Sequence, residues 1–279
     1  MEKRKLEKLG VETSLLGYGC MRFPMTADGK IDEAEAEKLL DTALAAGINY
    51  IDTAWPYHNG ESEPFVGKVL SKYPRDSYYL ATKLPVWLVK SLDEVDTYLE
   101  KQLERLRTDH IDFYLMHSLD KEDWDRMVEM GTVKRLEELK AEGKIRYLGF
   151  SFHDKYEVFE EILNYRDWDF CQIQLNYMDT DIQAGLKGYE LTAKKNIPLV
   201  IMEPVKGGTL ASFSEDLEEE FHKLDRKASV ASYALRWVGS LPNVKVILSG
   251  MSSMEQLQDN LATFADFKAL STEEKDTID

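Results

Sequence analysis

The sequence is poor in cysteine and lacks any long apolar run. Its two cysteines, Cys20 and Cys171, are far apart and form no CxxC pair, which excludes a disulfide framework and a cysteine-based metal site. We expect both to be reduced, buried thiols. No apolar run is long enough to cross a bilayer, and the first residues, MEKRKLEKLG, contain no hydrophobic core of a signal peptide. The sequence therefore predicts a cytoplasmic protein.

Positive charge is also scarce. Lys and Arg number 35 against 51 Asp and Glu, giving a net charge of −16. Such a surface repels phosphate backbones and anionic lipid, which argues against nucleic-acid and membrane partners. The acidic runs at 215–220 and from Glu273 are expected to be solvated surface. With 43% hydrophobic and 31% charged residues, the chain has the composition of a soluble globular protein with a large core.

Apolar, strand-like runs alternate with amphipathic helical runs along the whole chain. The expected strands cover 14–19, 48–51, 78–82, 111–116, 146–150, 170–174, 199–202 and 244–248. The expected helices cover 32–46, 61–72, 92–106, 123–141, 155–164, 183–194 and 228–238, with another from 253. No linker interrupts these eight units, so we expect one domain over residues 1–279.

Strands that alternate with helices indicate a parallel sheet, and eight such units predict an α/β fold, a closed (β/α)8 TIM barrel. The alternative is an open, doubly wound sheet. That fold normally carries a GxGxxG motif after its first strand, and no such motif occurs here. The sequence therefore favours the barrel.

Four polar residues follow three consecutive predicted strands: Asp52 and Tyr57, then Lys83, then His117. Taken singly, each has an ordinary structural explanation, such as a helix cap, a packed ring or a satisfied polar group. Together they stand where a barrel carries its chemistry, at the carboxyl ends of neighbouring strands. We expect them to converge on one site.

This set is suited to acid catalysis by a phenol. A tyrosine has a pKa of about 10, and a neighbouring ammonium lowers that pKa toward the working pH. Lys83 would supply the ammonium and Asp52 its counter-ion. His117 could orient a carbonyl oxygen or share its developing charge. No side chain supplies a hydride, so a nicotinamide cofactor is implied.

The segment 47–67, GINYIDTAWPYHNGESEPFVG, resembles the signature of the aldo-keto reductase family, in its bacterial type, and the resemblance extends along essentially the whole chain. It implies an NAD(P)H-dependent reductase of aldehydes or ketones. In that interpretation Tyr57 is the general acid and base, Lys83 and Asp52 tune it, and His117 orients the substrate.

The resemblance also implies a cofactor site. Ser151, in YLGFS, and Gln172, in CQIQ, would hold the nicotinamide carboxamide. The turn after the first strand, the loop at 202–208 and the segment ILSGMSSMEQLQDNL would hold the rest of the cofactor. These segments, with Asp52, place the following residues in the site: Met21, Arg22, Met202, Pro204, Val205, Lys206, Gly207, Gly250, Ser252, Gln256, Asp259 and Asn260.

The chain departs from the family pattern at several positions. Many members have asparagine where Phe152 stands, and many have an aromatic residue where Met202 stands. Members selective for NADPH often carry a lysine and an arginine where this chain has Gly250 and Gln256. The expected cofactor is NADPH, with NADH as the alternative.

The expected substrate is a small, mainly apolar carbonyl compound, because Trp55 and Trp87 follow strand ends and could line a pocket. The protein is expected to be a monomer. One alternative is a barrel that keeps its cofactor but serves as a regulatory subunit. Another is an isomerase or a metal-dependent hydrolase, but the five histidines include no HxH pair and a metal site is not expected. Some relatives of this subtype continue into a cysteine-rich iron–sulfur module. This sequence contains no such cluster of cysteines.

Overall fold

The computed structural model describes residues 1–278 and confirms the barrel. Eight parallel strands close on themselves in the order β10-β3-β4-β5-β6-β7-β8-β9, so each strand pairs with its neighbour along the chain and β10 pairs with both β3 and β9. The strands are β3 (Leu16–Gly19), β4 (Tyr50–Asp52), β5 (Tyr79–Leu84), β6 (Ile111–Leu119), β7 (Ile145–Phe152), β8 (Cys171–Gln174), β9 (Leu199–Met202) and β10 (Val244–Ser249).

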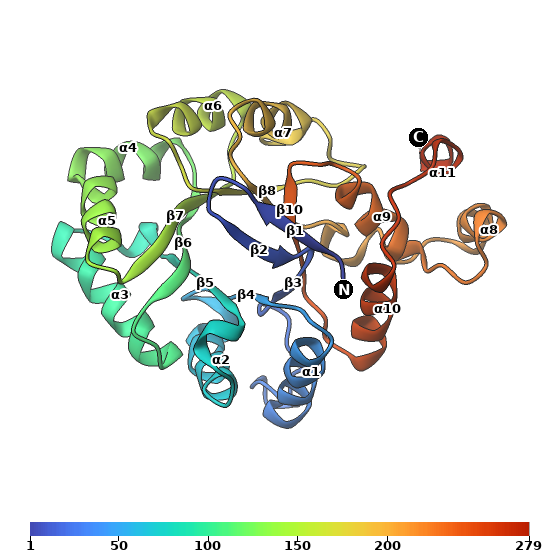
Figure 1. The fold of residues 1–279 in the computed structure, drawn as a ribbon, viewed down its shortest axis with the longest axis horizontal. Coiled ribbons are helices and arrows are strands. Elements are labelled where there is room, and N and C mark those ends of the chain that lie inside the picture. The colour runs from blue at the N-terminus through green and yellow to red at the C-terminus, as the bar shows by residue number, and fades with distance from the viewer. Residues whose placement is uncertain (279) are drawn as a thin grey trace.

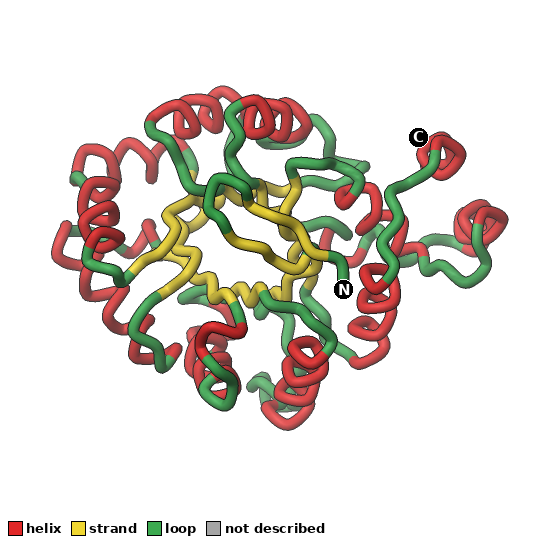
Figure 2. Tube along the Cα trace, in the orientation of Figure 1, coloured by secondary structure: helices red, strands yellow, loops and turns green. Residues whose placement is uncertain are grey.

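Helices form a ring around the barrel (Figure 2). They bury their apolar stripes against the strands, as Leu39, Leu40 and Ala43 of α1 do. The helices are α1 (Glu33–Ala45), α2 (Ser62–Leu70), α3 (Leu92–Leu106), α4 (Lys121–Met130), α5 (Thr132–Ala141), α6 (Tyr156–Tyr165), α7 (Gly185–Lys194), α8 (Glu215–Leu224), α9 (Val230–Gly239), α10 (Met254–Ala265) and α11 (Thr272–Ile278). Short 3-10 turns are η1 (Tyr57–Gly60), η2 (Arg75–Ser77), η3 (Val86–Leu88) and η4 (Lys206–Gly208).

An antiparallel hairpin of β1 (Lys3–Leu6) and β2 (Val11–Ser14) precedes the barrel and was not predicted. It lies across the end of the barrel that faces the viewer in Figure 1. Leu6 is fully buried and packs with barrel residues that include Phe113 and Phe170. The predicted first strand, 14–19, is therefore two elements, because Ser14 ends the hairpin and Leu16 begins β3.

An aromatic cluster fills the barrel above this hairpin. The Phe113 ring lies 5.0 Å from the rings of Tyr50, Tyr147 and Phe170 and 5.8 Å from that of Tyr79, measured between centroids. All five residues lie within the first three positions of their strands or, for Phe170, just before its strand. The barrel is thus plugged at the hairpin end, and the open end is the one formed by the carboxyl ends of the strands.

The expected helix at 123–141 is two helices. Gly131 has a left-handed backbone (φ 82°) and ends α4, and α5 begins at the next residue. Glycine tolerates this conformation without steric cost, so it is a natural place for the chain to turn between helices.

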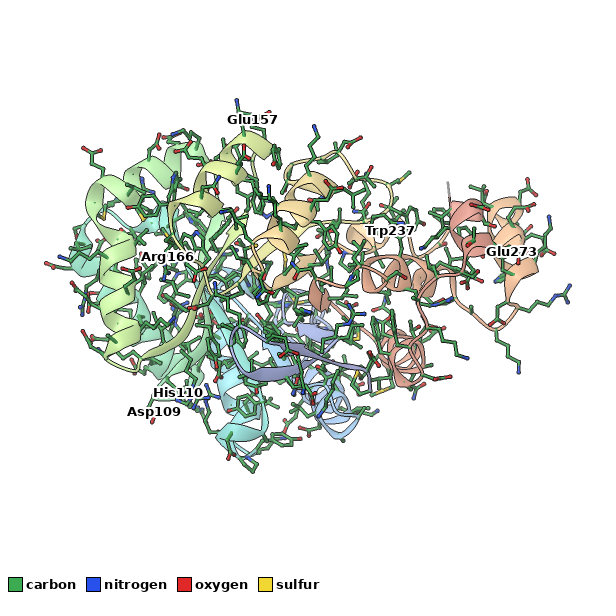
Figure 3. All side chains as sticks on the ribbon, turned by 45° about the horizontal axis from the view of Figure 1, so that its top comes forward. Asp109, His110, Glu157, Arg166, Trp237 and Glu273 are labelled. Atoms are coloured by element: carbon green, nitrogen blue, oxygen red, sulfur yellow. The ribbon has the colours of Figure 1, made fainter. Side chains whose placement is uncertain are left out.

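Both acidic segments form surface helices. The segment 215–220 lies in α8 and is largely exposed, as expected, and the chain from Thr272 forms α11. These two helices project from the barrel at the right of Figure 1, and Glu273 lies in this part of the molecule in Figure 3. Arg236 of α9 anchors α11 with a two-fold hydrogen bond to Glu274, at 2.7 and 2.9 Å. Across residues 1–278, the structure has no helix that is long and apolar enough to cross a membrane.

Helices α2 and α3 approach each other closely at Gly67. A Cβ at this position would lie 2.3 Å from the carbonyl oxygen of Arg105 and 2.7 Å from the Cα of Leu106. We expect Gly67→Ala to lower the free energy of unfolding by about 1–3 kcal/mol, because backbone atoms on both helices must move apart. Urea denaturation would measure this change.

The control is Lys68→Ala, at the exposed neighbouring position of the same helix. It should change the free energy of unfolding by about 0.5 kcal/mol or less. Equal effects of the two substitutions would show that the close approach at Gly67 does not limit stability.

Candidate active site

Three of the four predicted catalytic side chains meet around one ammonium group. Lys83 Nζ, on β5, donates to Asp52 Oδ1 at the end of β4 (2.7 Å) and to the carbonyl oxygen of Thr53 (2.8 Å). It also lies 3.3 Å from the hydroxyl oxygen of Tyr57. Lys83 is fully buried, and Asp52 is 2% exposed. These three acceptors match the three N–H donors of a charged lysine.

The loop between β4 and α2 brings Tyr57 to this point. Tyr57 begins the 3-10 turn η1, and the two residues after it, His58 and Asn59, have left-handed backbones with φ of 52° and 55°. Ser62, at the start of α2, donates to the carbonyl oxygen of Cys20 and shares a hydrogen bond with Thr53. The loop is therefore fixed at both ends, with the Tyr57 ring directed back over the barrel toward Lys83.

His117, near the carboxyl end of β6, completes the predicted group. Its ring centroid lies 6.0 Å from that of Tyr57 and 5.1 Å from that of Trp87. Burial lowers the pKa of His117 well below its usual value, and the Lys83 ammonium and His153 act in the same direction. The imidazole is therefore neutral at physiological pH.

Burial dominates the electrostatics of Tyr57 as well. It raises the pKa of the Tyr57 phenol above its ordinary value and outweighs the Lys83 ammonium, which acts to lower that pKa. The predicted lowering of the Tyr57 pKa toward the working pH is therefore wrong for this structure. For Lys83, burial acts to lower the pKa, but Asp52 and Tyr57 outweigh burial and raise it. The site thus holds a charged lysine beside a protonated phenol.

A cavity of about 530 Å³ opens above this group. Asp52, Tyr57 and His117 line it, whereas Lys83 is buried behind them. The cavity is also lined by nearly every residue that the resemblance placed in the cofactor site: Met21, Arg22, Ser151, Gln172, Met202, Pro204, Val205, Gly207, Gly250, Ser252, Gln256, Asp259 and Asn260. Lys206 is not among the lining residues of the described chain, and its Nζ instead pairs with Asp179 Oδ1 at 2.6 Å.

The residues predicted for the nicotinamide end leave a buried acceptor open. Gln172 Nε2 lies 3.5 Å from the Met202 sulfur, and Gln172 Oε1 is buried without a hydrogen-bond partner among residues 1–278. Ser151 Oγ accepts from the backbone N–H of Ser118 at 2.7 Å. Phe152 packs on Phe159 in the core, so it takes no part in this wall. An open carbonyl acceptor fits a carboxamide NH2 group.

The other end of the cavity is built from small and polar groups. A Cβ at Gly250 would lie 3.2 Å from the Arg22 Cβ, so these two segments are in close contact. Ser252 Oγ donates to the Arg22 carbonyl oxygen (2.7 Å), and Ser252 N donates to Gln256 Oε1 (2.8 Å). The turn after β3 is thus held against the segment that precedes α10, and the two segments together line this end of the cavity.

The structure places the two predicted substrate tryptophans differently. Trp87, 41% exposed, lies beside His117. Trp55 packs on α3, with its ring 4.9 Å from that of Tyr98 and 3.5 Å from the Arg105 guanidinium carbon. Neither Trp55 nor Trp87 lines the cavity of the described chain.

Three polar residues of the cavity, His153, Glu203 and Ser249, were not among the named site residues, although Glu203 and Ser249 lie within the predicted cofactor segments. His153 comes two residues after Ser151, and Glu203 comes directly after Met202. Proximity to the end of a strand was the available signal. Glu203 also has a left-handed backbone, with φ of 55°, which periodicity does not show.

Comparison with known proteins shows the family. The model of the aldo/keto reductase family matches residues 15–279. An uncharacterized oxidoreductase of Bacillus subtilis, YqkF, is 30% identical, covering 98% of this chain and 94% of the relative. An NADH-specific methylglyoxal reductase of Escherichia coli is 27% identical, covering 92% and 89%. The holo form of the aldo-keto reductase AKR11C1 of Bacillus halodurans is 29% identical with a TM-score of 0.81, covering 100% and 95%. The chain therefore belongs to the aldo/keto reductase family, as its sequence predicted.

Proposed function

We propose that this enzyme, acting as one domain over residues 1–279, reduces an aldehyde or ketone to an alcohol at Tyr57. Family membership supports NAD(P)H-dependent carbonyl reduction in general. The observation that supports the specific site is the placement of Lys83 Nζ between Asp52 Oδ1 and the Tyr57 hydroxyl, at the base of the cavity.

Tyr57 acts as the acid in this proposal. Its hydroxyl oxygen accepts from Lys83, so its own proton is free to point into the cavity. As negative charge develops on a carbonyl oxygen, Tyr57 transfers this proton to it, and Lys83 stabilises the phenolate that remains. Asp52 keeps the buried ammonium charged throughout.

His117 has a separate part. Because its imidazole is neutral and lies beside the Tyr57 ring, one of its ring nitrogens can donate a hydrogen bond to the same carbonyl oxygen. This bond orients the substrate without placing a second positive charge next to Lys83. We propose that Trp87, against His117, forms the apolar side of the substrate position, while a substrate role for Trp55 stays a prediction.

NADPH is the proposed cofactor, with NADH as the alternative, and its reduced nicotinamide supplies the hydride. Gln172 and Ser151 would hold the carboxamide, with Met202 beside them. Pro204, Val205, Lys206 and Gly207 would contact the pyrophosphate. Met21, Arg22, Gly250, Ser252, Gln256, Asp259 and Asn260 would hold the remainder.

The choice between the two cofactors depends on positive charge near the adenosine end. Arg22 is the one lysine or arginine that lines the cavity within residues 1–278. Neither Gly250 nor Gln256 supplies a cation there. The E. coli relative is named as NADH-specific, which supports NADH as the alternative here.

The first test is Tyr57→Phe. This change should lower kcat by about 10²–10⁴-fold, because it removes the proton donor and leaves the ring in place. The affinity for NADPH should be unchanged, as measured by quenching of tryptophan fluorescence. Tyr165→Phe, at an exposed ring on α6, is the control and should keep full activity. Wild-type turnover in the Tyr57 variant would refute its role as the acid.

The second test concerns cofactor choice. Gln256→Arg places a guanidinium at an exposed position beside Ser252. It should raise the affinity for NADPH relative to NADH by about tenfold, since a hydrogen bond to a charged group contributes about 1.5–3 kcal/mol and solvent weakens it here. Gln256→Glu should shift the preference the other way. If the ratio of NADPH affinity to NADH affinity is the same in the wild type and both variants, the 2′-phosphate does not bind near residue 256.

The third test uses pH. The folded protein holds the pKa of His117 well below the unfolded value of about 6.5, so as pH falls the unfolded chain binds a proton that the folded chain does not. Stability should therefore fall on acidification below about pH 6.5, by up to about 1.4 kcal/mol per pH unit from this residue. His117→Gln should remove that part of the slope in urea titrations at pH 7.5 and 5.5. His222→Gln, on α8, is the control. Identical slopes in the wild type and His117→Gln would contradict a depressed pKa.

A further inference from the structure

We propose that His58 is a positioning residue that holds the loop bearing Tyr57 against the turn at Met21 and Arg22. The inference rests on the proposed function, since it assigns Tyr57 as the acid and this turn to the cofactor. His58 directly follows Tyr57, and it does not line the cavity of the described chain. Its effect on the reaction would therefore be exerted through its neighbours.

The His58 ring makes specific contacts with the turn after β3. The backbone N–H of Phe23 donates to His58 Nε2 at 3.0 Å, and His58 Nδ1 lies 3.1 Å from the sulfur of Met25. The ring also stacks on that of Phe23, with centroids 5.6 Å apart and planes 29° apart. Phe23 is itself 2% exposed and packs edge-on against Phe65 of α2. The imidazole is thus docked on a rigid surface.

The backbone beside Tyr57 needs such a support. His58 (φ 52°, ψ 45°) and Asn59 (φ 55°, ψ 32°) are consecutive residues in the left-handed region, which non-glycine residues rarely occupy. Strained backbone of this kind persists where the surrounding contacts enforce it. His58, whose side chain makes these contacts, directly follows Tyr57, whose hydroxyl would donate the proton.

The same contacts connect the acid to the cofactor surface. Phe23, which bonds to His58, directly follows Met21 and Arg22, and both of these line the cavity. The Arg22 carbonyl oxygen accepts from Ser252 Oγ, at the start of the adenosine-end segment. A short path of backbone and hydrogen bonds therefore joins Tyr57 to the turn after β3 and, through Ser252, to the adenosine-end segment. A shift of His58 would move the acid relative to the cofactor.

The hydrogen bond also fixes the tautomer. Since Phe23 N–H donates to Nε2, that nitrogen carries no proton, and the neutral ring has its proton on Nδ1, facing the Met25 sulfur. A charged imidazole would direct an N–H at the N–H of Phe23. Burial lowers the pKa of His58, which favours the neutral form that this contact requires.

Two substitutions separate the hydrogen bond from the backbone conformation. His58→Asn suits the left-handed backbone but is too short to place an acceptor at the Nε2 position. His58→Gln reaches that position with its side-chain oxygen but suits the backbone less well. If the acceptor matters, Gln should keep kcat within about threefold of the wild type, and Asn should lower it by about 10–100-fold, the scale of a small misplacement of a catalytic group. The affinity for NADPH should weaken in Asn and recover in Gln.

The opposite order, with Asn as active as the wild type or more active than Gln, would overturn the proposal. A second measurement does not depend on turnover. The ¹⁵N spectrum of the histidine rings should show His58 as the Nδ1–H tautomer, in the wild type and in Tyr57→Phe, and an Nε2–H tautomer would refute the contact. If the wild type reduces no carbonyl, the proposed function fails, while the tautomer and NADPH affinity still test the placement of His58.

Discussion

The charged ammonium of Lys83, buried inside the barrel wall, is the constraint on which the site depends. Transfer of an ion from water into a protein interior costs several kcal/mol unless its donors are satisfied. Here the Asp52 carboxylate, the Thr53 carbonyl oxygen and the Tyr57 hydroxyl oxygen accept its three N–H groups. Because the phenol oxygen is one of these acceptors, Tyr57 is held in place by the electrostatic need of the lysine. In the proposed mechanism, the group that tunes the acid therefore also positions it.

The position of Lys83 is in turn fixed from the helix layer. Gln102 of α3 donates to the Lys83 carbonyl oxygen (2.9 Å) and to Glu63 Oε1 on α2 (2.7 Å), and Thr82 donates to the same Glu63 oxygen (2.6 Å). Tyr114 of β6 donates to Gln102 Oε1. This buried, satisfied network joins β5, β6, α2 and α3, so the backbone of Lys83 has little freedom to shift. The close approach of α2 to α3 at Gly67 makes these contacts geometrically possible.

The sequence predicted the barrel and the convergence of Asp52, Tyr57, Lys83 and His117 because both follow from local rules. The hydrophobic periodicity locates each strand and the residues at its carboxyl end, and parallel pairing brings these carboxyl ends together. What it missed depends on contacts between distant segments. The hairpin that contains Leu6 is stabilised by its packing on distant barrel residues, which the sequence of the hairpin does not show. The break between α4 and α5 depends on the left-handed backbone of Gly131. The pKa of Tyr57 was missed for the same reason. The ammonium that lowers this pKa can be predicted from sequence, whereas the burial that outweighs it cannot.

Charge explains why the proposed cofactor surface relies on shape. A dinucleotide carries a negative pyrophosphate, while this chain carries a net charge of −16, so long-range attraction does not favour binding. At physiological ionic strength such effects are screened beyond about 8 Å, and local groups decide. Arg22 is the cation that lines the cavity within residues 1–278, and the Lys206 ammonium is paired with Asp179. Gly250, which packs against Arg22, and Gly207 and Gly208, with φ of 62° and 101°, line the cavity without a side chain, so their backbone borders it. Affinity on this surface then depends on how accurately these turns are placed, and the hydrogen bonds from Ser252 and to His58 act on that placement.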